Sequence, residues 1–178
     1  MRIREATEAD AGALTRILND AITDDAAIGK DRIVDKDERI AWIAERHESG
    51  FPVLVAVSDD APDAIGDEEK VVGFASYGSW REGNGYRRTV ELSIYVHADH
   101  QGEGIGSTLL ESLIESARRQ KRHVMIAAIE SENEASIELH RTFGFELSGQ
   151  FREVGTKRGE WLNLSIMQLL LDEEQDDQ

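Results

Sequence analysis

The segment whose residue types and spacing point most directly to chemistry is Gln101-Gly102-Glu103-Gly104-Ile105-Gly106-Ser107. It stands between a segment of alternating apolar residues and an amphipathic one, so we expect a strand before it and a helix after it. Glycines let main-chain N–H groups approach a ligand closely, and the free N–H groups at a helix N-terminus attract anions. The segment therefore predicts a phosphate-binding turn.

Three other interpretations of this turn compete. A P-loop needs a lysine before its serine or threonine, and none precedes Ser107 or Thr108, so nucleotide hydrolysis is disfavoured. A dinucleotide-binding fingerprint needs glycine where Ser107 stands, although Glu130 follows the next predicted strand at a suitable distance, and this interpretation stays open as the minority one. An ordinary strand-to-helix turn would need only one glycine.

Glu91 is a candidate base. The segment Thr89–Val96 alternates between apolar and polar residues, which predicts a half-buried strand with Glu91 on its polar face. A carboxylate at that position can accept a proton from a reacting group. The residues alone favour the plainer interpretation of a solvated strand carboxylate.

Arginines gather in the aperiodic loop over residues 78–88. Arg81, Arg87 and Arg88 lie there with Trp80 and Tyr86 beside them. A guanidinium group matches the geometry of a carboxylate, so this loop is a candidate site for an acidic ligand. The alternative is that the arginines balance an acidic surface, and we expect this to hold for at least one of the three.

The elements that must position these residues follow from the spacing of apolar residues. Predicted helices begin near Thr7 and cover residues 37–46, 105–117 and 134–143, and predicted strands cover residues 53–57, 71–77, 89–96 and 123–129, with two more before Leu171. This order indicates a mixed α/β sheet flanked by helices in one domain over residues 1–171. Residues 172–178 form an acidic tail that we expect to be disordered.

Composition excludes several classes of function. The net charge of −16 opposes binding to nucleic acid, because lysines and arginines supply most of the affinity for phosphates. The chain has no cysteine, so an acyl-cysteine intermediate and disulfides are excluded. No apolar run approaches the ~18 residues of a membrane-spanning helix. We expect a cytoplasmic protein with no membrane partner. The acidic surface indicates a salt-rich cytoplasm that screens its charges, and the alternative is an ordinary acidic protein of a mesophile.

Several motifs in one order resemble a known family. Gln101-x-x-Gly104-x-Gly106 is similar to the pyrophosphate motif of the GNAT acetyltransferases, and the stretch from Asn133 through Ser136 and His140 to Phe145 resembles their downstream elements. The segments at residues 76–81, 85–91, 95–97, 154–157 and 167–169 resemble the phosphinothricin and methionine sulfone/sulfoximine acetyltransferase branch. The resemblance covers residues 3–171.

The resemblance implies a fold and a cofactor. The implied fold is a central mixed, mostly antiparallel sheet flanked by about four helices, with splayed strands that hold acetyl-CoA. The implied acetyl-CoA contacts are Ile94, Tyr95, Val96, Gln101, Gly102, Glu103, Gly104, Ile105, Gly106, Ser107, Asn133 and Ser136. Glu103 departs from the neutral or basic residue of many relatives, and its carboxylate is unfavourable beside a pyrophosphate unless it points to solvent.

The resemblance also implies an activity, the transfer of acetyl from acetyl-CoA to the amino group of a small amino-acid-like substrate. Glu91 would act as the base through water, and His140, where most of the superfamily has tyrosine, would act as the acid toward the thiolate. A core or capping histidine is an equal alternative for His140. Trp80, Arg81, Tyr86, Arg87 and Arg88 would contact the substrate.

Other assignments stay open. The acceptor is alternatively a protein N-terminus or another amine, or the domain binds acetyl-CoA without catalysis. A homodimer is implied, with the turn over residues 157–161 near the neighbouring site. His97 and His100 lack a third ligand, so we expect no metal.

Overall fold

The computed structural model describes residues 1–23, 32–59 and 71–171. The predicted acidic tail and most of the segment between the first two predicted strands lie outside these ranges. The chain divides into two compact units, Met1–Ser76 with Ser93–Ser112, and Tyr77–Leu92 with Leu113–Gln178.

Seven strands pair in the order β1-β2-β3-β4-β5-β7-β6. β4 and β5 are parallel, whereas the β1–β2, β2–β3, β5–β7 and β6–β7 pairs are antiparallel. Four α-helices accompany the strands in the part of the chain that the structure describes. The prediction of a mixed, mostly antiparallel sheet with about four helices is therefore confirmed.

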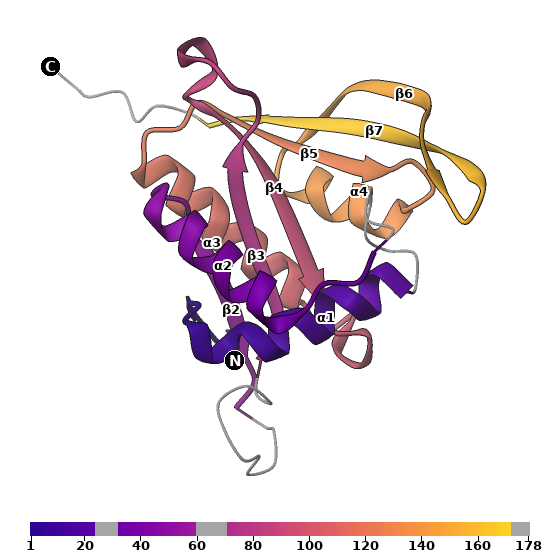
Figure 1. The fold of residues 1–178 in the computed structure, drawn as a ribbon. Helices are drawn as coiled ribbons and strands as arrows, with labels where there is room; N and C mark the ends of the chain where they lie inside the picture. The colour runs from indigo at the N-terminus through magenta and orange to yellow at the C-terminus, as the bar shows by residue number, and fades with distance from the viewer. Residues whose placement is uncertain (24–31, 60–70, 172–178) are drawn as a thin grey trace, which may run out of the picture. The chain divides into compact units, whose positions relative to one another are not determined.

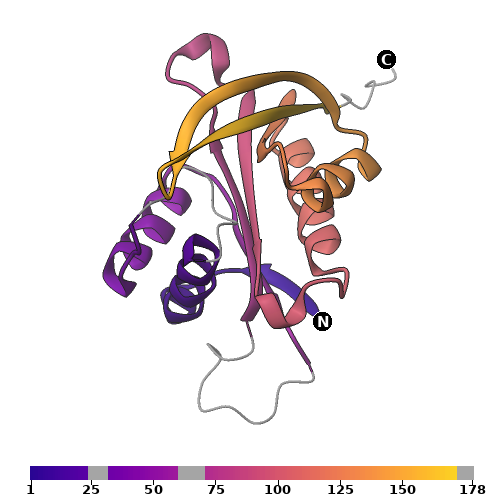
Figure 2. The same ribbon diagram turned by 90° about the vertical axis from the view of Figure 1, so that its right-hand side faces the viewer.

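The first unit is built on the first three strands. Its elements are β1 (Arg2–Glu5), α1 (Ala11–Thr23), α2 (Lys36–Glu48), β2 (Val53–Val57), most of β3 (Val71–Ser79), the end of β4 (Thr89–Val96) and the start of α3 (Ile105–Arg119). α1 and α2 lie side by side, as the indigo and purple helices of Figures 1 and 2 show. Their apolar faces pack with β2 and β3 into a core that includes Leu14, Ile43 and Phe74.

Polar side chains, buried before α1 and exposed before α2, fix where the helices of this unit begin. The carboxylate of Asp10 is fully buried and accepts two hydrogen bonds of 2.7 Å from the guanidinium of Arg4 and one of 2.8 Å from the amide of Thr7. The chain makes one 3₁₀ turn there before α1 begins at Ala11. α2 begins with a capping box, in which Asp35 and Glu38 each accept the other's main-chain N–H.

β1 was not predicted from the sequence. Arg2–Glu5 contains one apolar residue, Ile3, so it carries no apolar alternation. The strand forms because its main chain pairs with four of the five residues of the buried β2, from Arg2 opposite Val57 to Glu5 opposite Leu54. Tertiary pairing therefore decides this element.

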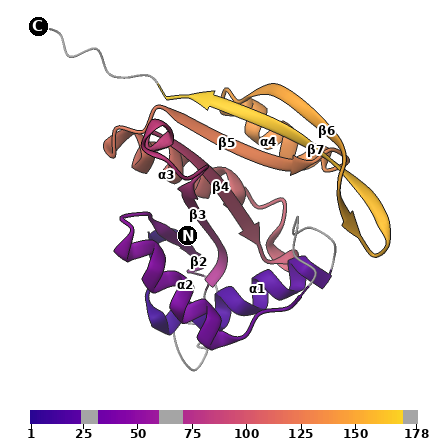
Figure 3. The ribbon, with the colours of Figure 1, turned by 45° about the horizontal axis from the view of Figure 1, so that its top comes forward.

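The second unit is built on the last strands. It contains β5 (Val124–Glu130), α4 (Glu134–Thr142), β6 (Glu146–Lys157) and β7 (Glu160–Leu170), with the first half of β4 and the second half of α3. Figures 1 and 3 show β6 and β7 as a long curved hairpin with β7 beside β5. Seven residue pairs join β5 to β7, so this unit has a continuous antiparallel framework.

Candidate active site

The glycine turn contains two left-handed glycines beside open space. Gly102 and Gly104 have φ angles of +81° and +82°, a region that costs other residues roughly 1–2 kcal/mol. A Cβ atom added to either glycine would meet nothing within 4 Å, so open space lies beside both. The carbonyl of Gly104 accepts the amide of Thr108 at 3.1 Å, which leaves the N–H groups of the preceding residues outside the helical hydrogen-bond ladder.

Glu103 has a partner in this turn. Its carboxylate lies 3.1 Å from Nδ1 of His100, and both side chains are partly exposed. The rings of His97 and His100 meet edge to face with centroids 5.8 Å apart. Within the ranges that the structure describes, no three metal-ligating side chains gather. The carboxylate of Glu103 is thus exposed and lies beside the imidazole of His100.

β4 carries two of the predicted site regions. Its register with β5 covers only Thr89–Glu91 opposite Val124–Ile126, so the segment from Ile94 to Val96 lies beyond that register. The ring of Tyr95 packs on Phe74 with centroids 5.2 Å apart.

The pKa of the Glu91 carboxyl is raised above its usual value because surrounding protein partly desolvates it. The side chain still has appreciable accessible surface, so both a proton and a water molecule can reach it. No hydrogen bond or ion pair from a described residue holds its carboxylate. A desolvated, reachable carboxylate is a suitable base near neutral pH.

His140 is buried, with 3% of its surface exposed, and burial lowers its pKa. Nδ1 lies 2.8 Å from the carbonyl of Ser136, so the neutral ring donates from Nδ1 and leaves Nε2 with a lone pair. Nε2 is buried without a hydrogen-bond partner, and the ring contacts Phe145 edge to face. An acid would need its proton on Nε2 instead, and the assignment of His140 as the acid stays a prediction.

Asn133 and Ser136 meet at the start of α4. The side-chain oxygen of Asn133 accepts the amide of Ser136 at 3.0 Å, which is a helix N-cap. Their three-residue spacing therefore has a structural use, and their predicted contact with acetyl-CoA stays a prediction.

The three arginines of the loop over residues 78–88 have three different partners. The guanidinium of Arg81 lies 4.6 Å from the ring of Trp80, which meets Tyr86 edge to face at 5.4 Å. Arg87 donates to the carbonyl of Asn84 at 3.1 Å. Arg88 donates through Nε to the carbonyl of Lys121, two residues beyond α3, at 3.0 Å. The bond of Arg88 favours the structural alternative for that arginine.

Sequence reasoning missed Arg39, which lies on α2 and has only 5% of its surface exposed. Its guanidinium carbon stands 4.5 Å from the centroid of the Trp42 ring. The available signal was helical spacing, because Arg39 lies four residues before the buried Ile43 on the same face.

Comparison with known proteins identifies the class. Residues 15–145 match the acetyltransferase (GNAT) family. A methionine sulfoximine/methionine sulfone acetyltransferase of Salmonella typhimurium is 49% identical over 97% of this chain and 96% of its own length. A phosphinothricin N-acetyltransferase of Streptomyces coelicolor is 30% identical over 93% of each chain. A Salmonella typhimurium acetyltransferase solved with acetyl-CoA has a TM-score of 0.89 at 49% identity, covering 97% of this chain and 94% of that one.

This chain therefore belongs to the GNAT acetyltransferase family, whose members use acetyl-CoA. The open space beside the two left-handed glycines, and the amides at the start of α3 that lie outside its hydrogen-bond ladder, would suit the diphosphate of that co-substrate. In the described part of the chain, no helix is long and apolar enough to cross a membrane.

Proposed function

We propose that this protein transfers the acetyl group of acetyl-CoA to the amino group of a small amino-acid-like substrate of the methionine sulfone, methionine sulfoximine or phosphinothricin type. The identity to named amino-acid acetyltransferases supports the substrate class. The observation that carries the chemistry is the desolvated carboxyl of Glu91, because an ammonium group must lose a proton before it can attack a thioester.

The contacts with acetyl-CoA are assigned to the glycine turn, the end of β4 and the start of α4. Main-chain N–H groups from Gly102 to Ser107 hold the diphosphate, with Gln101 at the entry of the turn, and the main chain of Ile94–Val96 pairs with the pantetheine arm. Asn133 and Ser136 complete the binding wall. Acetyl-CoA supplies the acetyl group as an activated thioester.

The catalytic steps assign one task to each residue. Glu91 removes a proton from the substrate ammonium through a water molecule. The amide of Val96 donates to the oxygen that becomes negative during attack. As the C–S bond breaks, the acetylated nitrogen loses its second proton, which Nε2 of His140 takes up and passes to the departing thiolate.

The arginine loop supplies the carboxylate site. Arg81 and Arg87 are the two candidates whose guanidinium groups stay on this loop, whereas Arg88 is bonded to the chain beyond α3. Trp80 and Tyr86 form the adjacent wall. A free carboxylate on the substrate favours amino acids over protein N-termini as acceptors.

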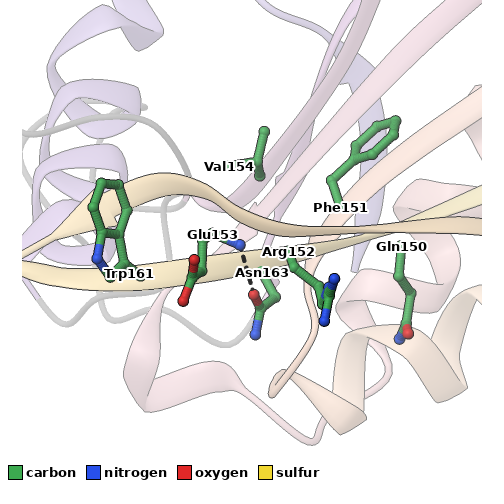
Figure 4. A pocket seen from close by; sticks show the side chains of 7 residues that line it. All are labelled: Gln150, Phe151, Arg152, Glu153, Val154, Trp161 and Asn163. Carbon is green, nitrogen blue, oxygen red and sulfur yellow. Dashed lines mark hydrogen bonds between the residues drawn. The ribbon is translucent and has the colours of Figure 1, made fainter.

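We further propose a cytoplasmic homodimer that uses the β6–β7 hairpin. Figure 4 shows Phe151, Val154 and Trp161 on the same side of this hairpin, beside a recess of about 710 Å³. All three are more than half exposed, and Trp161 is 67% exposed. Large apolar side chains exposed together are typical of protein interfaces. Analytical ultracentrifugation of the wild type and of Trp161→Ser tests this, and a wild-type monomer would contradict it.

An acceptor screen tests the proposed activity. The protein is incubated with acetyl-CoA and with methionine sulfone, methionine sulfoximine, phosphinothricin or a peptide, and the released thiol is measured. We expect turnover of the amino acids and little turnover of the peptide. Turnover of the peptide alone would favour an N-terminal acetyltransferase, and binding of acetyl-CoA without any turnover would favour a non-catalytic domain.

A further inference from the structure

Arg39 is a buried cation with unused hydrogen-bonding capacity. Its side chain is 95% removed from solvent, and its Nε is buried without a hydrogen-bond partner. None of the described residues gives its guanidinium a hydrogen bond or an ion pair within bonding distance. Burial accordingly lowers the pKa of Arg39.

Two other arginines of this unit, Arg4 and Arg32, form ion pairs with carboxylates. Arg4 makes a bidentate pair with the carboxylate of Asp10, both bonds at 2.7 Å. Arg32 makes a pair with Glu38, although both of those side chains are exposed. An unpaired cation is most costly where it is most buried. Arg39 is buried, and neither Arg39 nor the partly buried Arg46 on the same helix has a carboxylate partner among the described residues, so the surroundings of Arg39 need an explanation.

A series of aromatic ring contacts begins at this cation. Trp42 lies 4.5 Å from the guanidinium carbon, and its ring meets Phe74 edge to face at 6.4 Å. Phe74 in turn packs on Tyr95 at 5.2 Å. Burial raises the pKa of the Tyr95 phenol against the opposing effect of the Arg39 charge, so the phenol keeps its proton. Arg39 thus offers N–H donors and Tyr95 an O–H donor near the apolar rings of Trp42 and Phe74.

A set of donors without acceptors calls for a ligand that brings acceptors. The substrates that name the relatives share such a group, because methionine sulfone, methionine sulfoximine and phosphinothricin each end in a tetrahedral sulfur or phosphorus that carries oxygen and a methyl group. Oxygen would accept from the donors, and the methyl group would suit the rings.

We propose that Arg39, with Tyr95, binds the oxygen atoms on the sulfur or phosphorus at the end of the substrate side chain. This inference rests on the proposed function and adds a specificity-determining residue to it. It gives the side-chain end of the substrate to Arg39 and Tyr95, which both belong to the first unit. Unsubstituted methionine, which has no oxygen on sulfur, then gains nothing from Arg39.

The test compares kcat/KM for L-methionine sulfone and L-methionine in the wild type and in Arg39→Met. Methionine replaces the guanidinium with an apolar side chain of similar length. We expect kcat/KM for the sulfone to fall roughly 10- to 100-fold, the size of a lost charge-assisted hydrogen bond, with little change for methionine. Arg46→Met is the control, because Arg46 lies on the same helix 5.4 Å from the same Trp42 ring.

A second measurement separates recognition from folding. Removing an unpaired buried charge should leave the melting temperature of Arg39→Met equal to or above that of the wild type. If that variant does not fold, Arg39→Lys keeps the charge without the guanidinium geometry, and it should lower the preference for the sulfone in the same direction.

The outcomes are distinct. Equal loss for sulfone and methionine, or loss of thermal stability without a change in their ratio, would assign Arg39 a structural role and overturn the inference while the proposed function stands. A wild type that acetylates no amino acid would refute the proposed function together with the inference.

Discussion

At the scale of single residues, the two predicted catalytic groups differ in what their surroundings do to them. Partial burial raises the pKa of Glu91 and leaves its carboxylate reachable, which suits a base. Burial lowers the pKa of His140, and its hydrogen bond to Ser136 keeps the proton on Nδ1. The local environment therefore supports the role of Glu91 more directly than that of His140.

We predict that Glu91→Gln lowers kcat about 10²- to 10⁴-fold, because the amide keeps the shape of the side chain but cannot accept the proton. Binding of acetyl-CoA, measured by calorimetry, should be unchanged. A variant with wild-type kcat across the pH range would remove Glu91 from the mechanism.

The raised pKa of Glu91 also predicts a pH dependence. The base is active only when deprotonated, so kcat/KM should rise with pH through a pKa above the usual glutamate value. For stability the sign is opposite, because the folded state holds this proton more tightly than the unfolded state does. The contribution of Glu91 to the free energy of unfolding is fully present below the pKa that this group has in the unfolded chain. It is lost as the pH rises through the pKa that the group has in the folded protein. Glu91→Gln should abolish both effects, and an ascending limb that persists in this variant would assign it to another group.

At the scale of elements, close approach of β3 to its neighbours depends on Gly73. A Cβ atom there would lie 3.1 Å from the Tyr95 carbonyl, 3.1 Å from Ile105 and 3.2 Å from Leu109. All of these atoms belong to the first unit, so the contact joins β3 to β4 and α3 within it.

Gly73→Ala should therefore destabilise the protein by about 1–3 kcal/mol through overpacking. Urea denaturation measures this free energy of unfolding. Gly149→Ala on β6 is the matched control, because a Cβ atom there meets nothing within 4 Å. Equal stabilities of the two variants would show that the neighbours of Gly73 move aside easily.

The start of α2 is a second test at this scale. The side chain of Asp35 accepts the amide of Glu38 at 2.8 Å, and the carboxylate of Glu38 accepts the amide of Asp35 at 2.9 Å. Asp35→Ala should cost about 1 kcal/mol of stability, measured by thermal or urea unfolding. Asp35→Asn retains the acceptor and should recover most of this loss, and an alanine variant as stable as the wild type would contradict the capping role.

At the scale of the whole molecule, a net charge of −16 on 178 residues implies self-repulsion that salt should screen. We predict that the melting temperature rises with KCl concentration. A Glu111→Gln/Glu132→Gln variant, which removes two exposed charges, should show a smaller rise. A melting temperature independent of KCl would refute an adaptation to high salt.

The sequence by itself determined the long elements and the glycine turn. α3 and the strands β2 to β5 follow from the spacing of apolar residues. The proposed phosphate site at Gln101–Ser107 uses main-chain groups of that segment, because amides at a helix start and glycine torsions are local properties. The long elements and the glycine turn depend on residues that are close together in the sequence, so they can be predicted from the sequence.

The tertiary structure decided what depends on distant partners. β1 exists through pairing with β2, Arg88 is held by a carbonyl beyond α3, and Arg39 is buried against Trp42 without an acidic partner from the described residues. Burial and pairing are set by residues far apart in the chain, and spacing along one segment carries no information about them. That is why the sequence placed the glycine turn and the candidate base, while only the fold revealed the unpaired cation.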